Sequence, residues 1–66
     1  MTLGEKLSIL RKENNYTQEQ LADILSVSRQ SVSKWESNIA YPETDKLIRL
    51  STLFNVAIDE IGRAHV

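Results

Sequence analysis

Cysteine is absent from this 66-residue chain, and the sequence has only two glycines, one proline and four aromatic residues. Without cysteine it can form neither a disulfide framework nor a thiolate metal site, which fits a reducing, cytoplasmic location. The single histidine, His65, lies near the end of the chain and has no second ligand beside it. No glycine-rich phosphate loop or carboxylate pair suited to a catalytic pocket is evident. The sequence therefore predicts a protein that is not an enzyme and has no metal or cofactor.

Long apolar runs and a strong excess of one charge are also missing. The opening stretch MTLGEKLSIL has no basic flank and no long apolar segment, so we expect neither a signal peptide nor a membrane span. The formal net charge is -1 and the pI is about 5.7, which argues mildly against a polyanionic partner. A chain of this length forms one domain, whose small core supplies only ~3 to 5 kcal/mol of net stability.

Apolar residues recur at helical spacing, and no alternating strand pattern occurs. Thr2 with Glu5 forms a capping box before the first helix, and Thr17 with Gln20 forms one before the second. The first three expected helices cover about Leu3 to Glu13, Gln18 to Leu25, and Arg29 to Ser37, the third of which is capped by Ser28 and ended at Asn38. A fourth is capped by Thr44 and has the apolar residues Leu47, Leu50, Leu53 and Phe54. A fifth, of one or two turns, is expected within VAIDEIG, residues 56–62. This pattern predicts a compact, all-α bundle of five helices.

The connection between the second and third expected helices is only three residues long, SVS at 26–28. Helices joined so briefly must cross steeply if they are to share one core, and the small side chain of Ala22 allows a close crossing. The alternative is a helical hairpin inside another kind of bundle, which the same leucines permit. The short turn and the polar third helix favour a helix-turn-helix over about residues 17–37.

The third expected helix has two different faces. At roughly 100° per residue, Val32 and Trp35 fall on one arc. The opposite arc holds Arg29, Gln30, Ser33 and Lys34. Arginine can donate two hydrogen bonds to guanine, and glutamine can pair similarly with adenine, each worth ~1 to 3 kcal/mol of discrimination. The alternative is an ordinary solvated face.

The stretch TQEQLADILSVSRQSVSKWESN, residues 17–38, resembles the helix-turn-helix of the lambda-type repressor family, also called the XRE family. The likeness extends from LGEKLSILRK before it to YPETDKLIRLSTLFNVAIDEI after it. The matching residues are Arg11, Gln18, Leu21, Ala22, Val27, Ser28, Val32, Trp35, Glu36 and Pro42. The resemblance implies a DNA-binding domain over residues 1–61 whose third helix enters the major groove. It further implies a transcriptional regulator of the repressor type that binds a pseudo-palindromic operator in double-stranded DNA as a homodimer.

The resemblance also assigns roles to individual residues. Base contacts fall to Arg29, Gln30, Ser33 and Lys34, although Lys34 could instead touch a phosphate. Phosphate contacts are expected from Thr17, Gln18, Ser28, Ser31, Ser37 and Asn38, with Ser28 as a cap and Asn38 as a turn residue in the alternative reading. Gln18 is further expected to brace the start of the third helix beside Arg29. Hydroxyls and amides bind phosphate without formal charge, so a pI of about 5.7 is only in part an argument against DNA as the partner.

An ion pair between Arg11 and Glu36 is implied by the family pattern, where the matching residues link the first helix to the end of the third. The alternative for Arg11 is a contact with a phosphate. Trp35 and Tyr16 occupy apolar-periodic positions, so we expect them in the core. The sequence does not decide whether Tyr41 lies in the core.

Three features depart from the family pattern. Ser26 stands where a glycine usually adopts a left-handed turn, at a penalty of roughly 1 to 2 kcal/mol. Ala57 stands where a serine usually caps the fifth helix, which forgoes ~0.5 to 2 kcal/mol. The tail GRAHV, residues 62–66, lacks the apolar pattern and is expected to be disordered or foreign to the native sequence.

The apolar residues expected at a dimer interface are Val56, Ile58 and Ile61, which could equally close the core of one monomer. Two other functions stay open. The same fold could serve as a protein-binding module of the antitoxin or scaffold type, for which the acidic pI is the best support. The chain could also be the DNA-binding part of a longer, ligand-sensing regulator.

Overall fold

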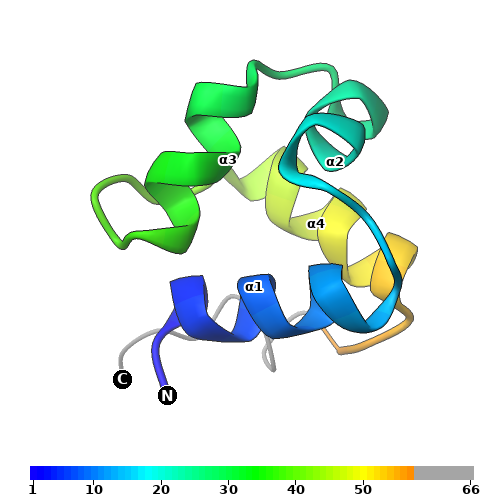
Figure 1. Ribbon diagram of the computed structural model, residues 1–66. Coiled ribbons are helices and arrows are strands. Elements are labelled where there is room, and N and C mark those ends of the chain that lie inside the picture. The colour runs from blue at the N-terminus through cyan, green and yellow to red at the C-terminus, as the bar shows by residue number, and fades with distance from the viewer. Residues whose placement is uncertain (58–66) are drawn as a thin grey trace.

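The computed structural model describes residues 1–57, and the secondary structure of this part is entirely helical (Figure 1). Its helices are α1 (Leu3–Glu13), α2 (Gln18–Leu25), α3 (Arg29–Glu36) and α4 (Thr44–Phe54). The all-α prediction is confirmed for these residues. The predicted fifth helix falls mainly on residues 58–62, which lie outside the described residues, as does the tail at 62–66. Val56 and Ala57, where that prediction begins, are not helical.

Both predicted capping boxes are present. In α1 the Thr2 hydroxyl accepts a hydrogen bond from the Glu5 backbone N–H (3.1 Å), while the Glu5 carboxylate accepts one from the Thr2 backbone N–H (2.9 Å). The Thr2 backbone N–H, helped by the Thr2 hydroxyl, holds the pKa of Glu5 below its ordinary value. Thr17 and Gln20 repeat the arrangement at α2, with distances of 3.0 and 2.8 Å. These local bonds explain why both helices begin where the sequence predicts.

The end of α3 differs by one residue from the prediction. The helix ends at Glu36, and Ser37 is its C-cap rather than its last helical residue. Asn38, where the sequence predicts the end of this helix, has a φ of 63° and is thus in the left-handed conformation. Asparagine tolerates this conformation better than most residues, so the chain can leave α3 sharply.

The start of α4 was predicted wrongly. Glu43, and not Thr44, is the N-cap, and its side chain makes no capping bond. The Glu43 carbonyl accepts hydrogen bonds from the backbone N–H groups of Lys46 and Leu47, both at 2.9 Å. Because these bonds already form the first helical turn, Thr44 lies inside the helix. The extended backbone before the helix ends at Glu43, which has φ −66° and ψ 159°, so Thr44 is not in the conformation of an N-cap.

All four helices contribute to one apolar core. The buried side chains are Leu3, Leu7, Leu21, Ala22, Leu25, Val32, Trp35, Leu47, Leu50 and Phe54. Tyr16 packs against this core from the α1–α2 loop, and its ring centroid lies 6.3 Å from that of Phe54. The prediction that Trp35 is a core residue is confirmed, whereas Tyr16 is only partly buried and packs against the core. Within residues 1–57 no helix combines the length and the apolar character needed to cross a membrane.

The α2–α3 turn is built around a left-handed residue. Ser26 has φ 59° and ψ 43°, as expected for a position where the family favours glycine. The Val27 backbone N–H donates to the Ala22 carbonyl at 2.9 Å, and the Val27 side chain packs against the core. Ser28 then caps α3 by accepting a bond from the Ser31 backbone N–H at 3.1 Å. The turn therefore holds α2 and α3 at a fixed crossing.

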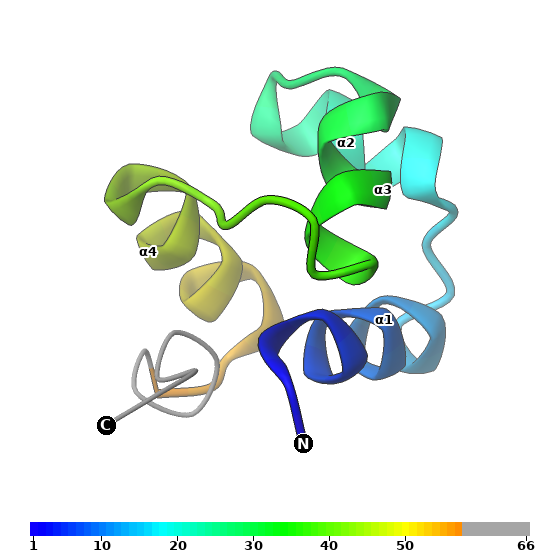
Figure 2. The ribbon, with the colours of Figure 1, turned by 90° about the vertical axis from the view of Figure 1, so that its left-hand side faces the viewer.

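Figure 1 shows α3 on the left-hand side of the molecule, with the turn from α2 leading into its first residues and α1 running below its last turn, and in Figure 2 this side faces the viewer. A glycine permits the close approach of α1 and α3. A Cβ atom on Gly4 would lie 2.5 Å from the Glu36 carbonyl oxygen and 2.7 Å from that of Trp35. The first turn of α1 thus contacts the backbone at the end of α3 and leaves the start of α3 uncovered by α1.

Candidate nucleic-acid interface

The two faces predicted for α3 are both present. Val32 is fully buried, and only 6% of Trp35 is exposed. Of the four residues predicted to contact bases, Arg29, Gln30 and Lys34 are exposed and Ser33 is half-buried. Together these four line one shallow hollow on the protein surface. The helix therefore buries one side and presents a contiguous set of donors and acceptors on the other.

This outer face can form the hydrogen bonds that distinguish base pairs. Arginine offers two parallel N–H donors, and the glutamine amide offers one donor and one acceptor. Those sets match the major-groove edges of guanine and adenine, respectively. Arg29 and Gln30 occupy the first turn of α3, which is the end that reaches bases when a recognition helix lies in the groove.

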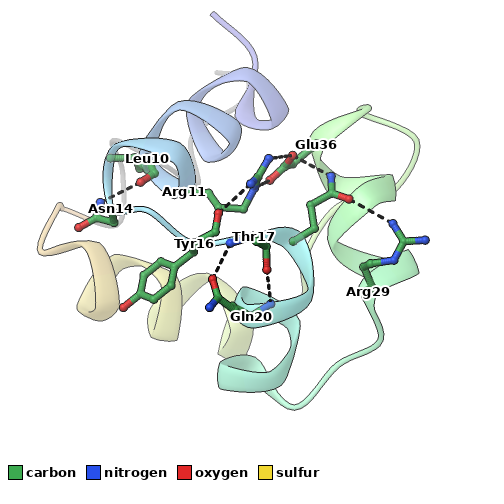
Figure 3. A network of polar contacts seen from close by, with 9 residues as sticks. Leu10, Arg11, Asn14, Tyr16, Thr17, Gln20, Arg29 and Glu36 are labelled. Atoms are coloured by element: carbon green, nitrogen blue, oxygen red, sulfur yellow. Dashed lines mark hydrogen bonds and ion pairs between the residues drawn. The ribbon is translucent and has the colours of Figure 1, made fainter.

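A chain of polar contacts links residues of α1 and α2 to the first turn of α3 (Figure 3). Arg11 donates to the Glu36 carboxylate through Nε (2.7 Å) and Nη2 (3.2 Å), which confirms the predicted ion pair. Gln18 donates from Nε2 to Glu36 Oε1 at 3.0 Å. Arg29 Nη1 donates to Gln18 Oε1 at 3.4 Å, so Gln18 neighbours Arg29 as expected. Arg11 also donates to the Tyr16 carbonyl at 2.8 Å and is thus tied to the protein rather than directed outward.

The residues predicted to contact phosphate lie at three places. Thr17 and Gln18 are at the start of α2, where the hydroxyl of exposed Thr17 is part of the capping box. Ser28 and Ser31 are at the start of α3, and their hydroxyl oxygens lie 3.1 Å apart. Ser37 is exposed at the end of α3. The starts of α2 and α3 thus lie near one another, joined by the bond from Arg29 to Gln18.

Asn38 has a role that sequence reasoning did not identify. Its side-chain oxygen accepts a hydrogen bond from the Gly4 backbone N–H, and its amide nitrogen donates to the Thr2 hydroxyl, both at 3.1 Å. The side chain therefore ties the loop after α3 to the first turn of α1. Only the second N–H of the amide is left for a phosphate.

Residues 7–61 match a family model described as Helix-turn-helix. The chain belongs to the helix-turn-helix family of the lambda-repressor type.

Curated helix-turn-helix relatives match over most of this chain. It is 51% identical over 61 residues to the HTH-type transcriptional activator BcrR of Enterococcus faecalis, a match that covers 92% of this chain and 30% of that protein. It is 37% identical over 59 residues to the HTH-type transcriptional regulator ImmR of Bacillus subtilis, covering 89% and 46% of the two chains. It is 34% identical over 61 residues to the CTXphi transcriptional repressor RstR of Vibrio cholerae, covering 92% and 54%. The chain thus spans about half or less of the length of these relatives.

Two solved structures share the fold. The P22 c2 repressor protein, in complex with a synthetic operator, superimposes with a TM-score of 0.89 at 25% identity over 98% of each chain. A transcriptional regulator from Listeria innocua has the same TM-score at 37% identity, over 98% of this chain and 60% of that one. The arrangement of α1 to α4 is accordingly that of a lambda-type helix-turn-helix domain.

The helix-turn-helix is braced by Arg49, which the sequence analysis missed. Arg49 in α4 donates through Nη2 to the Ile24 carbonyl at 2.7 Å and through Nη1 to the Leu25 carbonyl at 3.5 Å. A cation at this place satisfies carbonyls at the C-terminal end of α2 and opposes the negative end of its dipole. No local sequence signal marks Arg49, since its partners lie 24 and 25 residues away.

Gly4 was also missed, although its sequence context offers a signal. Glycine is unfavourable inside a helix, so a glycine in the first turn of a strongly periodic segment suggests close packing.

The predicted dimer residues are only partly described. Val56 is half-buried and packs against the core of its own chain, which fits the alternative in which it closes the monomer. Ile58 and Ile61 lie outside the described residues. In residues 1–57 no three acidic or histidine side chains come together as metal ligands would.

Proposed function

We propose that this helix-turn-helix domain binds double-stranded DNA with α3 in the major groove and thereby regulates transcription. The observation that most supports this is the exposed flank of α3, where Arg29, Gln30, Ser33 and Lys34 line one surface hollow while Val32 and Trp35 face the core. Any surface helix has a polar outer face, but here the first turn of that face holds an arginine and a glutamine, which carry the hydrogen-bonding groups that base edges require. The operator bound to the similar P22 repressor supports DNA as the ligand.

In this proposal base recognition centres on the first turn of α3. Arg29 pairs with the O6 and N7 atoms of a guanine, and Gln30 pairs with the N6 and N7 atoms of an adenine. Ser33 and Lys34, one turn further along, contact the next base or its phosphate. Each well-formed two-bond contact contributes ~1 to 3 kcal/mol of discrimination.

Phosphate contacts flank α3 on both sides. Thr17 and Gln18 use the start of α2, where backbone N–H groups and the positive end of the helix dipole favour an anion. Ser28 and Ser31 contribute at the start of α3. Ser37, together with the remaining N–H of Asn38, contributes at its end. These groups are uncharged, and the chain has a formal net charge of -1, so the salt dependence of binding should be shallow for a DNA-binding protein.

The domain binds DNA as a homodimer in this account. One recognition helix covers only a few base pairs, and dimers of this type place two helices one DNA turn apart, roughly 34 to 36 Å. The residues proposed for the contact between the two chains are Val56, Ile58 and Ile61, of which only Val56 lies among the described residues. Sedimentation of the protein on its operator should give two chains per site; one chain per site would refute the dimer.

Repression is the proposed outcome of binding, because the P22 and CTXphi proteins that resemble this chain are repressors. The enterococcal relative is an activator, so a reporter assay decides the direction of regulation independently of DNA binding.

Selection from a pool of random double-stranded DNA tests the proposal. We expect enrichment of a pseudo-palindrome whose half-sites are centred about one helical turn apart. The matched control is a variant with Arg29, Gln30 and Lys34 all changed to alanine, which retains the buried face of α3. Failure of the wild-type chain to enrich any sequence, or enrichment of the same sequence by the control, would contradict the proposed function.

A further inference from the structure

Four side chains form a continuous path from the interior to the proposed DNA-binding face. Arg11 contacts Glu36, Glu36 accepts from Gln18, and Gln18 accepts from Arg29. The inner pair is well buried, with 11% of the Arg11 side chain and 7% of the Glu36 side chain exposed. Arg29, at the outer end, is exposed. Figure 3 shows this path running from α1 to the first turn of α3.

The middle of the path is the side-chain amide of Gln18, which has a hydrogen-bond donor, the NH2 group, on one side and an acceptor, the oxygen, on the other. A glutamine side chain can turn over and exchange its oxygen with its NH2 group, which occupies almost the same space. An ionised carboxylate only accepts hydrogen bonds, and a guanidinium only donates them. With Glu36 on one side and Arg29 on the other, Gln18 can satisfy both neighbours in one orientation only. Its NH2 group must face Glu36 and its oxygen must face Arg29, as observed.

Glu36 sets this orientation because it is itself held in place. Two bonds from Arg11, at 2.7 and 3.2 Å, fix the carboxylate as it accepts the bond from Gln18 at 3.0 Å. If the amide were reversed, two acceptors would face each other at Glu36 and two donors at Arg29. A neutral amide at position 36 could pair with either end of the Gln18 amide, so only the single 3.4 Å bond from Arg29 would still favour the observed orientation.

We infer that Glu36 is a positioning residue for DNA recognition: acting through Gln18, it holds the Arg29 guanidinium in the orientation that selects a guanine. The inference rests on the proposed function, since Arg29 must be the residue that contacts the base. The bond to Gln18 occupies one of the five guanidinium N–H groups, so the two that a guanine contact requires remain available. Holding Arg29 before DNA arrives reduces the conformational entropy lost on binding.

The test compares Glu36→Gln with wild type by the ratio of dissociation constants for two DNAs. One is the selected operator, and the other has adenine in place of the guanine that pairs with Arg29. Glu36→Gln should lower this specificity ratio by about threefold to tenfold. In a Gln18→Ala background the same substitution should not change the ratio, because the connecting amide is gone. An unchanged ratio in the wild-type background, or an equal change in both backgrounds, would overturn the inference.

Two further variants separate positioning from stability. Arg11→Met/Glu36→Gln removes both charges together and avoids an unpaired buried cation, so it replaces Glu36→Gln if the single variant does not fold. It should lower the specificity ratio to the same extent. Leu53→Ala removes apolar packing of α4 against the core and should destabilise the domain without a contact to the path, so its specificity ratio should equal that of wild type. A lowered ratio for Leu53→Ala would show that instability alone explains the effect, and the inference would fall.

A measurement without DNA separates this inference from the proposed function. In the 15N-labelled free protein, Glu36→Gln should shift the side-chain N–H signals of Gln18 and the Nη1–H signals of Arg29, the atoms that form the bonds of the path. The Arg29 shift should disappear when Gln18 is already alanine. An Arg29 signal that does not respond to Glu36→Gln rules out the path whether or not the protein binds DNA. If random DNA selection enriches nothing, the proposed function fails and this signal alone decides whether the path exists.

Discussion

Arg11 Nε lies 2.7 Å from Glu36 Oε2, and about nine-tenths of each side chain is buried. This pair joins α1 to the last residue of α3 across 25 positions of sequence. A buried ion pair adds little to net stability when both members are present, but the loss of one leaves the other charge unsolvated. The pair therefore determines the position of α3 relative to α1 more than it contributes to the net stability of the domain.

Glu36→Gln should lower the free energy of unfolding by about 3 kcal/mol, because it leaves the Arg11 charge without its counterion. Arg11→Met/Glu36→Gln should be more stable than the single variant by about 1 kcal/mol or more. Urea unfolding, with the same stabilising osmolyte present for every variant, measures both. The control is Asp45→Asn, which breaks the ion pair between Asp45 and Lys46. The Asp45 side chain is 66% exposed, so this substitution should change the free energy of unfolding by less than about 1 kcal/mol. Equal effects of Glu36→Gln and Asp45→Asn would contradict the role given to the buried pair.

Gly4→Ala should destabilise the domain by about 1 to 3 kcal/mol, although alanine is intrinsically the better helix former by ~1 kcal/mol. The added methyl would lie 2.5 Å from the Glu36 carbonyl oxygen, so α1 must move away from the end of α3. Thermal unfolding measures the change, with Lys12→Ala on the exposed side of α1 as the control. A Gly4→Ala variant as stable as wild type would mean that the two helices can separate freely.

Arg49→Met should lower stability by about 1 kcal/mol, since it removes the donors that satisfy the Ile24 and Leu25 carbonyls while it retains the apolar stem. Arg49→Lys keeps the charge near the end of α2 and should lose less. Urea unfolding at low and high salt distinguishes the two variants. The proposed role of the Arg49 charge at the C-terminal end of α2 fails if Met and Lys have the same effect.

Ser26→Gly should raise stability by about 1 kcal/mol, because Ser26 has a φ of 59°, where a Cβ atom is unfavourable. Ser37→Gly is the matched control: Ser37 has a φ of −91°, so glycine there should lower stability by about 0.5 kcal/mol. The two substitutions are chemically identical and should act in opposite directions in thermal unfolding. Changes of the same sign would show that backbone conformation is not the cause.

The starts of α1 and α2 could be predicted from the sequence because their signals are local. The capping boxes at Thr2 and Thr17 involve residues three positions apart, and the observed helices begin directly after them. The start of α4 was missed by one residue, since Glu43 is the N-cap without a side-chain capping bond and so gives no capping signal in the sequence. The outward face of α3 followed from helical periodicity alone.

Contacts between distant residues could not be predicted in this way. The ion pair between Arg11 and Glu36 was expected only from the family resemblance. The bonds of Asn38 to Thr2 and Gly4 join residues 34 to 36 positions apart and required the folded arrangement of α1 and α3. The link from Gln18 to Glu36 is similar: each residue was singled out, but not their contact, because periodicity places side chains on faces without showing which faces meet.

The most direct test of α3 in the major groove replaces, one at a time, each guanine of the selected operator with 7-deazaguanine. This analogue lacks the N7 acceptor in the major groove but keeps its base pairing and its minor-groove edge. At one guanine in each half-site, the wild-type protein should lose about 5- to 20-fold in affinity at constant salt, whereas Arg29→Ala should lose nothing further. Equal binding of wild type to every substituted operator, or the same loss for Arg29→Ala, would contradict the placement of α3.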